Sequence, residues 1–370
     1  MSVRGINQVL KVISSSIKQN PSRFSIVSGN QSGDLDSIVS AISYAYFNHI
    51  HNSSSLMIPL LNFTRKELSS RKDVLLVFQK HGIDTQNLFF TDDLTQLKNV
   101  DQLILVDHNS PQGKVKNPGL EIVGIIDHHE DEGIAIDAKP RIIQKSGSCS
   151  SLVFKYWYDL IGDSNKIEDS IIKFLLAPLV IDTSNLTSKV EDIDVQVFKI
   201  YSKYLHDFDT GAFYKDVRKA KDDIEGLSLD DIFLKDYKSF EFEVGSSDVV
   251  KKVGITSVVK PFDWLEDRFA KLNQGAKMFL EDQHLDIFII MTSYLNKDDQ
   301  FNRQLGIIGA SESDDVLINL ALEAVKDQLE IETLPKYTEE SPKLQVFQQK
   351  NLASSRKQVA PAFKNALERL

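Results

Sequence analysis

The chain has 370 residues, of which 42% are hydrophobic and 26% charged, and this length and composition predict a globular protein of about two domains. A net charge of -10 excludes a protein that binds nucleic acid or anionic membranes through a general basic excess. The single cysteine, Cys149, excludes an internal disulfide and a zinc site built from several cysteines. No apolar run has transmembrane length, and we expect a cytoplasmic protein.

The N-terminal segment is basic, since Asp34 is the first acidic residue of the chain. Its positive residues are Arg4, Lys11, Lys18 and Arg23. A basic, serine-containing segment is one feature of an organelle transit peptide. Four apolar residues, however, share one face of a helix: Val9, Leu10, Ile13 and Ile17. This pattern favours an ordinary helix packed on the core, because transit peptides are richer in arginine.

Residues 24–29 predict a first strand and residues 35–50 the helix that follows it. Asn30, Asp34 and Asp36 stand between strand and helix. Two acids so close in the chain can converge on a shared cation, but either acid could instead cap the N-terminus of the helix. The pair alone does not distinguish a metal site from a helix cap.

Two further predicted strands end in an acid followed by histidine. Residues 102–106 lead into Asp107-His108-Asn109, and residues 121–126 lead into Asp127-His128-His129. Open α/β sheets bind ligands at the carboxyl ends of their strands, and carboxylate with imidazole is a ligand set for divalent transition metals. A single such strand end could lead into a solvated loop. Three predicted strands of one chain lead into acids, at Asp34, Asp107 and Asp127, and this recurrence favours a metal site.

Residues 146–151 open a further predicted helix with small and hydroxyl side chains. Either the free backbone N–H groups bind an anion or a serine caps the helix, and both interpretations stay open. Cys149 has no obvious base near it in the sequence, which favours a packed thiol over a nucleophile. A strongly apolar predicted helix, residues 167–181, then leads into Asp182, one more acid after a hydrophobic segment.

The composition becomes polar and charged between residues 206 and 226, which marks a domain junction. Before the junction, alternating strands and helices predict an α/β domain with a mostly parallel sheet, residues 1–208. After it we expect a smaller α/β domain, residues 213–370. Its predicted strands are 240–244, 249–259, 284–293 and 304–308, with a long helix over 263–283.

The acids and histidines at these segment ends form one predicted constellation. The candidate metal ligands are Asp34, Asp36, Asp107, His128 and Asp182, with Asn30, His108 and His129 near them in the sequence. Carboxylates gathered in one crevice repel each other unless cations neutralise them. Such ligands suit Mn²⁺, Mg²⁺ or Co²⁺, and two ions sharing a carboxylate form a clamp for an in-line phosphoryl displacement. We therefore expect direct hydrolysis by a metal-activated water.

Four motifs, in this order, resemble the DHH phosphoesterase superfamily. They are Asn30-x₃-Asp34-x-Asp36, Val106-Asp107-His108-Asn109, Gly124-Ile-Ile-Asp127-His128-His129 and Ile181-Asp182-Thr183. The C-terminal stretch Ser355-Arg356-Lys357-Gln358-Val359-x-Pro361 resembles the DHHA2 domain of the branch that contains family II inorganic pyrophosphatases and exopolyphosphatases. The resemblance spans nearly the whole chain. It implies a DHH domain and a DHHA2 domain, with the active site in the cleft between them.

The resemblance also implies a role for each matched residue. Asp107 resembles a ligand that bridges two metals, and the remaining implied ligands are Asp34, Asp36, His128 and Asp182. The implied catalytic residues are Asp107, His128 and His129, with Asp127 orienting an imidazole. The implied substrate contacts are Asn30, His108, His129, Lys238, Arg356 and Lys357. The C-terminal motif favours phosphate binding for Arg356 and Lys357, whereas Lys238 could equally be a solvated surface charge.

One position departs from the pyrophosphatase pattern. Family II pyrophosphatases begin the first motif with a histidine that binds metal, and this chain has Asn30 there. The departure resembles the cytosolic exopolyphosphatases of fungi and the related prune-type proteins. Because an amide is a weaker metal ligand than imidazole, we expect one of the two metal sites to be weaker or more hydrated.

The expected function is that of an exopolyphosphatase, which uses two divalent ions to release terminal orthophosphate from inorganic polyphosphate. The alternatives are a family II-type inorganic pyrophosphatase and a prune-like short-chain polyphosphatase or phosphodiesterase. An interaction protein without activity is disfavoured, because the acids and histidines are all present. We expect no nucleic-acid or membrane partner and no obligate protein partner.

Overall fold

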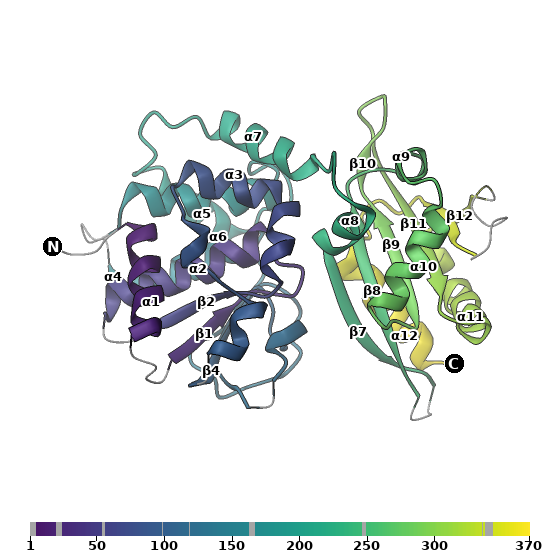
Figure 1. The fold of residues 1–370 in the computed structure, drawn as a ribbon. Coiled ribbons are helices and arrows are strands. Elements are labelled where there is room, and N and C mark those ends of the chain that lie inside the picture. The colour runs from purple at the N-terminus through teal and green to yellow at the C-terminus, as the bar shows by residue number, and fades with distance from the viewer. Residues whose placement is uncertain are drawn as a thin grey trace. The chain divides into compact units, whose positions relative to one another are not determined.

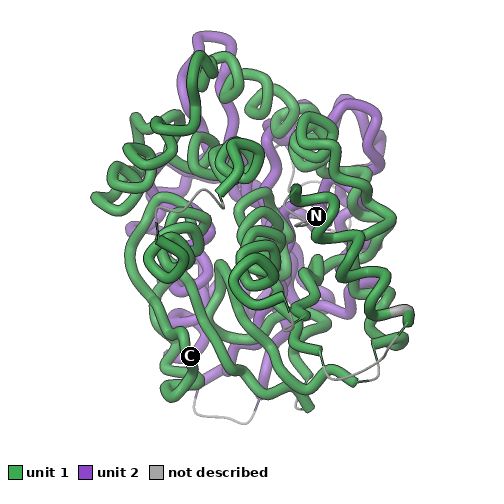
Figure 2. Tube along the Cα trace, turned by 90° about the vertical axis from the view of Figure 1, so that its left-hand side faces the viewer, with its two compact units in different colours: residues 1–223 green, residues 224–370 purple. Residues whose placement is uncertain are grey.

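The structure is a computed structural model that describes most of the chain in two compact units, Met1–Asp223 and Ile224–Leu370 (Figures 1 and 2). The described residues are 5–19, 24–53, 56–97, 99–117, 119–162, 167–245, 249–334, 336 and 343–370. Arg4 and Arg23 of the basic N-terminal segment lie outside these ranges, as does the side chain of Lys18.

The first unit contains a six-stranded parallel sheet in the order β3-β2-β1-β4-β5-β6. The strands are β1 (Phe24–Ser28), β2 (Met57–Leu61), β3 (Phe89–Phe90), β4 (Val100–Val106), β5 (Glu121–Asp127) and β6 (Arg141–Ile143). The chain first forms β1, β2 and β3, which lead to one edge of the sheet, and then forms β4, β5 and β6, which lead from the other side of β1 to the opposite edge. The point where the strand order reverses, at which open α/β sheets bind ligands, therefore lies between β1 and β4. The prediction of a parallel N-terminal sheet is confirmed.

Helices flank this sheet along the described part of the first unit (Figure 1). They are α1 (Ile6–Gln19), α2 (Leu35–His51), α3 (Lys72–Lys80), α4 (Cys149–Ile161), α5 (Asp169–Asp182), α6 (Asp192–Tyr201) and α7 (Thr210–Asp222). Short 3₁₀ turns lie at Arg65–Ser70, Thr85–Asn87, Thr91–Gln96 and Gly113–Val115. Val9, Leu10 and Ile13 of α1 are buried in the same core as the sheet, so the amphipathic stripe in this segment packs as expected.

The second unit contains a mixed sheet in the order β12-β13-β11-β9-β8-β7, with the short β10 paired to β11. Its strands are β7 (Tyr237–Glu243), β8 (Val250–Val258), β9 (Ile287–Thr292), β10 (Tyr294–Leu295), β11 (Phe301–Gly309), β12 (Ile331–Thr333) and β13 (Gln345–Gln349). Its helices are α8 (Leu229–Lys235), α9 (Phe262–Arg268), α10 (Leu272–Asp282), α11 (Glu312–Leu329) and α12 (Arg356–Glu368). Alternate strand residues face two separate cores, one under α11 and α12 and the other under α8 to α10.

The long helix predicted over residues 263–283 is wrong. The chain forms two helices, α9 and α10, separated by residues 269–271, where Phe269 (φ -122°, ψ 91°) and Lys271 (φ 160°, ψ 49°) lie outside the helical region. Leu265 of α9 and Leu272 of α10 are both buried, so the break lets each short helix pack on the core.

Candidate metal centre

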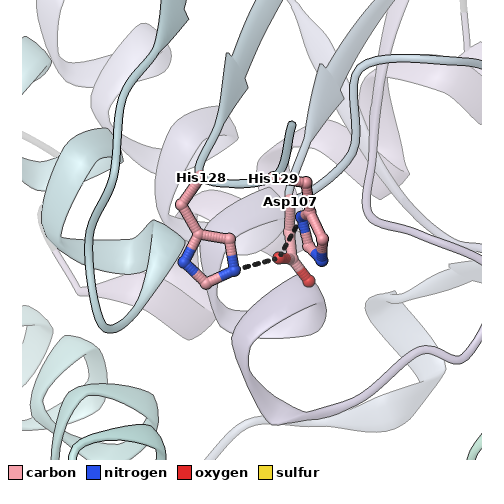
Figure 3. Close-up of side chains that lie close together, drawn as sticks. All are labelled: Asp107, His128 and His129. Atoms are coloured by element: carbon pink, nitrogen blue, oxygen red, sulfur yellow. Dashed lines mark ion pairs between the residues drawn. The ribbon is translucent and has the colours of Figure 1, made fainter. Parts of the chain in front are cut away.

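Asp107, His128 and His129 form a compact group at the carboxyl ends of β4 and β5 (Figure 3). The Nε2 atom of His128 lies 3.2 Å from Oδ1 of Asp107, and Nδ1 of His129 lies 3.8 Å from the same oxygen. Because β4 and β5 are parallel neighbours, the residues that directly follow them meet at one edge of the sheet. One potential ligand atom from each side chain lies within 4.8 Å of the other two.

The hydrogen bonds of His128 leave its Nε2 atom facing a carboxylate. Nδ1 of His128 lies 2.9 Å from the backbone oxygen of Ser146, which can only accept, so the proton of a neutral ring is on Nδ1. Nε2 then carries a lone pair that points at the Asp107 oxygen 3.2 Å away. Two acceptors at this distance require a cation or a proton between them. These two atoms, an imidazole nitrogen and a carboxylate oxygen, therefore fit as ligands of a divalent metal ion.

Asp127 lies behind the two imidazoles and orients His129. Its Oδ1 atom lies 2.7 Å from Nδ1 of His129, and its Oδ2 atom accepts a 2.6 Å hydrogen bond from Nδ2 of Asn109. Burial raises the pKa of Asp127, but the hydrogen bond and charge of His129, with the hydrogen bond from Asn109, bring the net pKa below the usual value. Asp127 is therefore an acceptor, so His129 carries its proton on Nδ1 when its ring is neutral.

Asp107 is held in place by the loop that follows β1. Its Oδ2 atom accepts hydrogen bonds from Nδ2 of Asn30 at 2.7 Å and from Oγ of Ser37 at 2.6 Å. Its backbone has a φ of 61°, an uncommon left-handed conformation for a residue with a side chain. With Oδ2 used by these two donors, Oδ1 is the oxygen that faces His128.

The NH₂ group and the Oδ1 atom of Asn30 both form hydrogen bonds within the protein. Its Oδ1 atom accepts from the N–H and from the hydroxyl of Ser32, at 3.0 and 2.6 Å. These donors fix the orientation of the amide, so its NH₂ group must face Asp107. In this structure Asn30 supports the carboxylate of Asp107 by hydrogen bonding.

Asp34 and Asp36 follow the same loop but have different surroundings. Asp34 is the N-cap of α2 and accepts from the N–H of Ser37 at 3.0 Å. Asp36 reaches the N-terminus of α4, where it accepts from the N–H groups of Cys149 and Ser150 at 2.7 and 2.9 Å. The hydroxyl of Ser148 adds a further bond at 2.8 Å. Ser148 is the N-cap residue of α4 without a capping hydrogen bond from its side chain, and the carboxyl group of Asp36 binds the N–H groups at this helix terminus.

Asp182 stands at the last position of α5, beside a strained turn. Three consecutive residues after it, 184–186, have positive φ angles between 49° and 64°. Thr183 closes the helix, because its hydroxyl donates to the Leu179 oxygen at 2.5 Å and accepts the N–H of Leu186 at 3.0 Å. The helix therefore ends sharply at the acid.

A close approach fixes the segment that carries Ser146. A Cβ atom on Gly147 would lie 2.5 Å from Cγ2 of Thr183 and 2.6 Å from the Lys189 oxygen, so only glycine fits. Asp194 accepts the N–H of Gly147 at 2.6 Å. This contact holds the carbonyl of Ser146 in position for His128.

The pKa shifts of Asp36 and Asp182 show that both acids are buried close to other charged groups. Burial raises the pKa of Asp36 well above its usual value, and the charges of Asp107 and Asp182 raise it further. Burial likewise raises the pKa of Asp182 to about 7, while the charge of Lys221 acts in the opposite direction. Lys221, on α7, is a functional candidate that the sequence interpretation missed, since nothing in a highly charged helix distinguishes it.

The predicted His108 has a different environment from His128. Its Nδ1 atom lies 2.9 Å from the backbone oxygen of Val106, on its own strand, and the side chain is buried. The compact ligand group of Asp107, His128 and His129 does not include it.

The predicted basic residues belong to the second unit. Arg356, the first residue of α12, makes a two-pronged contact with Asp236: Nη1 donates to the backbone oxygen at 2.8 Å and Nη2 to Oδ1 at 2.6 Å. Lys238 follows two residues later on β7 and is 8% exposed, whereas Lys357 is exposed. Arg356 therefore binds the residue directly before β7, the strand that carries Lys238.

The chain belongs to the DHH family. Residues 25–180 match the N-terminal domain of that family, and residues 215–366 match the DHHA2 domain. No helix among the described residues has both the length and the apolar character that a membrane span needs.

Relatives of this chain are named as exopolyphosphatases or inorganic pyrophosphatases. A protein of Schizosaccharomyces pombe named "Putative exopolyphosphatase" is 32% identical, over 96% of this chain and 94% of that protein. "Exopolyphosphatase PRUNE1" of Mus musculus is 28% identical, over 92% of this chain and 75% of that protein. A "Probable manganese-dependent inorganic pyrophosphatase" of Lactobacillus delbrueckii is 24% identical, over 74% of this chain and 83% of that protein. The resemblance to the DHH and DHHA2 domains and to a fungal exopolyphosphatase is confirmed.

A solved structure agrees with the fold. The crystal structure of a Methanococcus jannaschii "putative family II inorganic pyrophosphatase" superposes with a TM-score of 0.64 at 20% identity. It covers 93% of this chain and 99% of that one. At this level of identity the likeness establishes the architecture of two α/β domains.

Proposed function

We propose that this protein is an exopolyphosphatase, a hydrolase that releases terminal orthophosphate from inorganic polyphosphate with the help of divalent metal ions. The observation that carries the proposal is the pair of facing acceptors, Nε2 of His128 and Oδ1 of Asp107, 3.2 Å apart. Membership of the DHH family and the names of the S. pombe and mouse relatives support the substrate.

The residues proposed to hold two metal ions, Mn²⁺, Mg²⁺ or Co²⁺, are Asp34, Asp36, Asp107, His128 and Asp182. The name of the Lactobacillus relative supports a manganese-type ion. When bound, such ions polarise phosphoryl oxygens and make a water molecule more acidic. Ser146 and Ser37 orient His128 and Asp107, and Asp127 turns Nε2 of His129 toward the phosphate.

Basic residues of the second domain are proposed to bind the phosphate chain. Arg356 suits this role because its guanidinium binds oxygen pairs, and its contact with Asp236 leaves further N–H groups for a ligand. Lys238 and Lys357 are the other proposed contacts. We accordingly propose a division of labour in which residues 1–208 hold the metals and residues 213–370 hold the substrate.

Two substrate contacts implied by the resemblance stay predictions. Asn30 and His108 are each 2% exposed. Asn30 is bound to Asp107, and His108 is bound to the backbone oxygen of Val106. The cytoplasmic location and the absence of an obligate protein partner also stay predictions, which cell fractionation and the oligomeric state of the purified protein would test.

The alternative function is a family II-type inorganic pyrophosphatase. It is supported by the name of the Lactobacillus relative, but Asn30 stands where the pyrophosphatase pattern has a metal-binding histidine. The Oδ1 atom of Asn30 is already engaged by Ser32, which argues further against a ligand at this position.

The purified protein should be assayed for orthophosphate release from long-chain polyphosphate, tripolyphosphate and pyrophosphate, with Mn²⁺ or Mg²⁺. We expect the polymer to be hydrolysed faster than pyrophosphate and Asp107→Ala to abolish release. Asp159→Ala is the matched control, since Asp159 is an exposed acid paired with Lys155 on α4. Absence of polymer hydrolysis with either ion would exclude the proposal, and faster pyrophosphate hydrolysis would establish the alternative.

A further inference from the structure

A buried arginine underlies the β1–α2 loop, residues 29–34, which carries Asn30 and Asp34. The side chain of Arg71 is 2% exposed. Its Nη2 atom donates to the Ser32 oxygen at 2.7 Å and its Nε atom to the Gly33 oxygen at 2.8 Å. A third bond, from Nη1 to the Glu67 oxygen at 2.8 Å, ties the same group to the 3₁₀ turn before α3. One planar group therefore joins the loop to a separate segment.

An aromatic ring fixes the position of this guanidinium. The carbon of the Arg71 guanidinium lies 3.9 Å from the centre of the Phe63 ring. Gly33 packs on the same ring: it has a φ of 55°, and a Cβ atom there would lie 2.2 Å from the ring. The loop therefore rests on Phe63 and Arg71 together, and the close approach leaves no space for a side chain at residue 33.

A continuous chain of hydrogen bonds runs from Arg71 to the proposed metal ligand Asp107. Arg71 holds the oxygen of Ser32, and Ser32 in turn donates its N–H and its hydroxyl to Oδ1 of Asn30. The NH₂ group of Asn30 then donates to Oδ2 of Asp107 at 2.7 Å. Displacement of the loop would therefore move the donor that orients Asp107.

We propose that Arg71 is a positioning residue of the metal centre: it holds the β1–α2 loop in the one arrangement that lets Asn30 orient Asp107. This inference rests on the metal binding in the proposed function. Lysine cannot replace it, since a single ammonium group does not reach three carbonyl oxygens in the planar arrangement of a guanidinium.

Arg65 is a control because its guanidinium also packs on a ring and binds backbone oxygens, although it is more exposed and forms an ion pair with Asp93 at 3.1 Å. Its guanidinium lies 4.2 Å from the centre of the Phe90 ring, and Phe90 packs edge-on against Phe63. It donates to the oxygens of Thr85 and Leu88 at 3.0 and 2.9 Å. These carbonyls lie in a turn that supplies no proposed ligand, so Arg65 stabilises the fold without reaching the metal centre.

The test compares Arg71→Lys with Arg65→Lys by titrating Mn²⁺ into each purified protein in a calorimeter, with thermal unfolding measured alongside. We expect Arg71→Lys to weaken Mn²⁺ binding by about tenfold or more, the effect typical of residues that orient metal ligands. Arg65→Lys should lower the unfolding temperature but leave the Mn²⁺ affinity within about twofold. Equal Mn²⁺ affinities for the two variants would overturn the inference.

Ser32→Ala keeps the test decisive if Arg71→Lys does not fold. It removes the hydroxyl donated to Asn30 but no contact of Arg71, and we expect a several-fold loss of Mn²⁺ affinity; unchanged affinity would overturn the proposed path. The wild-type titration separates the two proposals. Mn²⁺ binding without polyphosphate hydrolysis would contradict the function alone, and absence of Mn²⁺ binding would contradict both.

Discussion

Two stretches with nearly the same sequence, Asp107-His108-Asn109 and Asp127-His128-His129, lie at the ends of neighbouring parallel strands but differ in which side chains face the candidate metal centre. In the first stretch the acid faces the candidate metal centre and the histidine bonds back to its own strand. In the second stretch the two histidines face the candidate metal centre, and Asp127 is outside the ligand group and bonds Nδ1 of His129. A shared motif therefore does not give shared roles.

The difference arises from the backbone at the end of each strand. Asp107 lies just past the end of β4 and adopts a φ of 61°, whereas Asp127 is still the last residue of β5. The left-handed backbone at Asp107 accompanies a side chain that faces His128, whereas the side chain of Asp127 is bound by His129 and Asn109. The two acids are thus expected to differ strongly when mutated.

The largest expected effect is that of Asp107→Asn. It removes the charge shared by the proposed metals, and we expect orthophosphate release to fall by about a thousandfold, since a metal supplies several kcal/mol of transition-state stabilisation. Release should be measured at saturating Mn²⁺, with Asp159→Asn as the control for an exposed acid. A rate within about threefold of wild type would show that Asp107 is no ligand.

The corresponding change in the second motif, Asp127→Asn, should have a smaller effect. Loss of the acceptor that orients His129 is expected to weaken metal binding or activity by about 10–100-fold. The test is to compare kcat and Mn²⁺ affinity of the two Asn variants in one experiment. If Asp127→Asn were as damaging as Asp107→Asn, the two acids would have equivalent roles and the contrast drawn between the motifs would be wrong.

A pH dependence follows from Asp182, whose pKa is raised to about 7 mainly by burial. Its folded-state pKa exceeds the unfolded value, so the stability that its proton contributes is present at low pH and is lost as pH rises through about 7. Metal ions replace that proton. Mn²⁺ should therefore raise the unfolding temperature more at about pH 8 than at about pH 5, measured by thermal melts. An equal or larger rise at the lower pH would contradict this assignment.

The smallest expected effect is that of Asn109→Ala, at the third position of the first motif. Asn109 donates to Asp127 at 2.6 Å and to the Glu130 oxygen at 2.8 Å, and it accepts the N–H of Glu132. Its loss leaves buried groups unpaired and should lower stability by about 1–3 kcal/mol. Urea unfolding would measure this, and kcat should change less than in Asp127→Asn. A larger loss of kcat would give Asn109 a direct role.

The sequence predicts the framework of the site because the relevant signals are local. Apolar runs that end in Asp107 and Asp127 specify strands and their polar ends, and the alternation of strands and helices predicts a parallel sheet. The helix-cap alternative for Asp34 could also be stated from residue type and position, and the structure shows that contact.

The partners of these residues could not be predicted, because they come from distant parts of the chain. Asp36 meets the N–H of Cys149, 113 residues away, and Asn30 meets Asp107, 77 residues away. No local propensity encodes such pairs. Lys221 and Arg71 were missed for the same reason: only the packed structure shows that one lies among buried acids and the other beneath the β1–α2 loop.

The most direct test of the central claim is anomalous diffraction from crystals grown with Mn²⁺. The account predicts a manganese peak bound by Oδ1 of Asp107 and Nε2 of His128, the two acceptors that face each other at 3.2 Å. A crystal saturated with Mn²⁺ in which neither of these atoms binds a metal would contradict it.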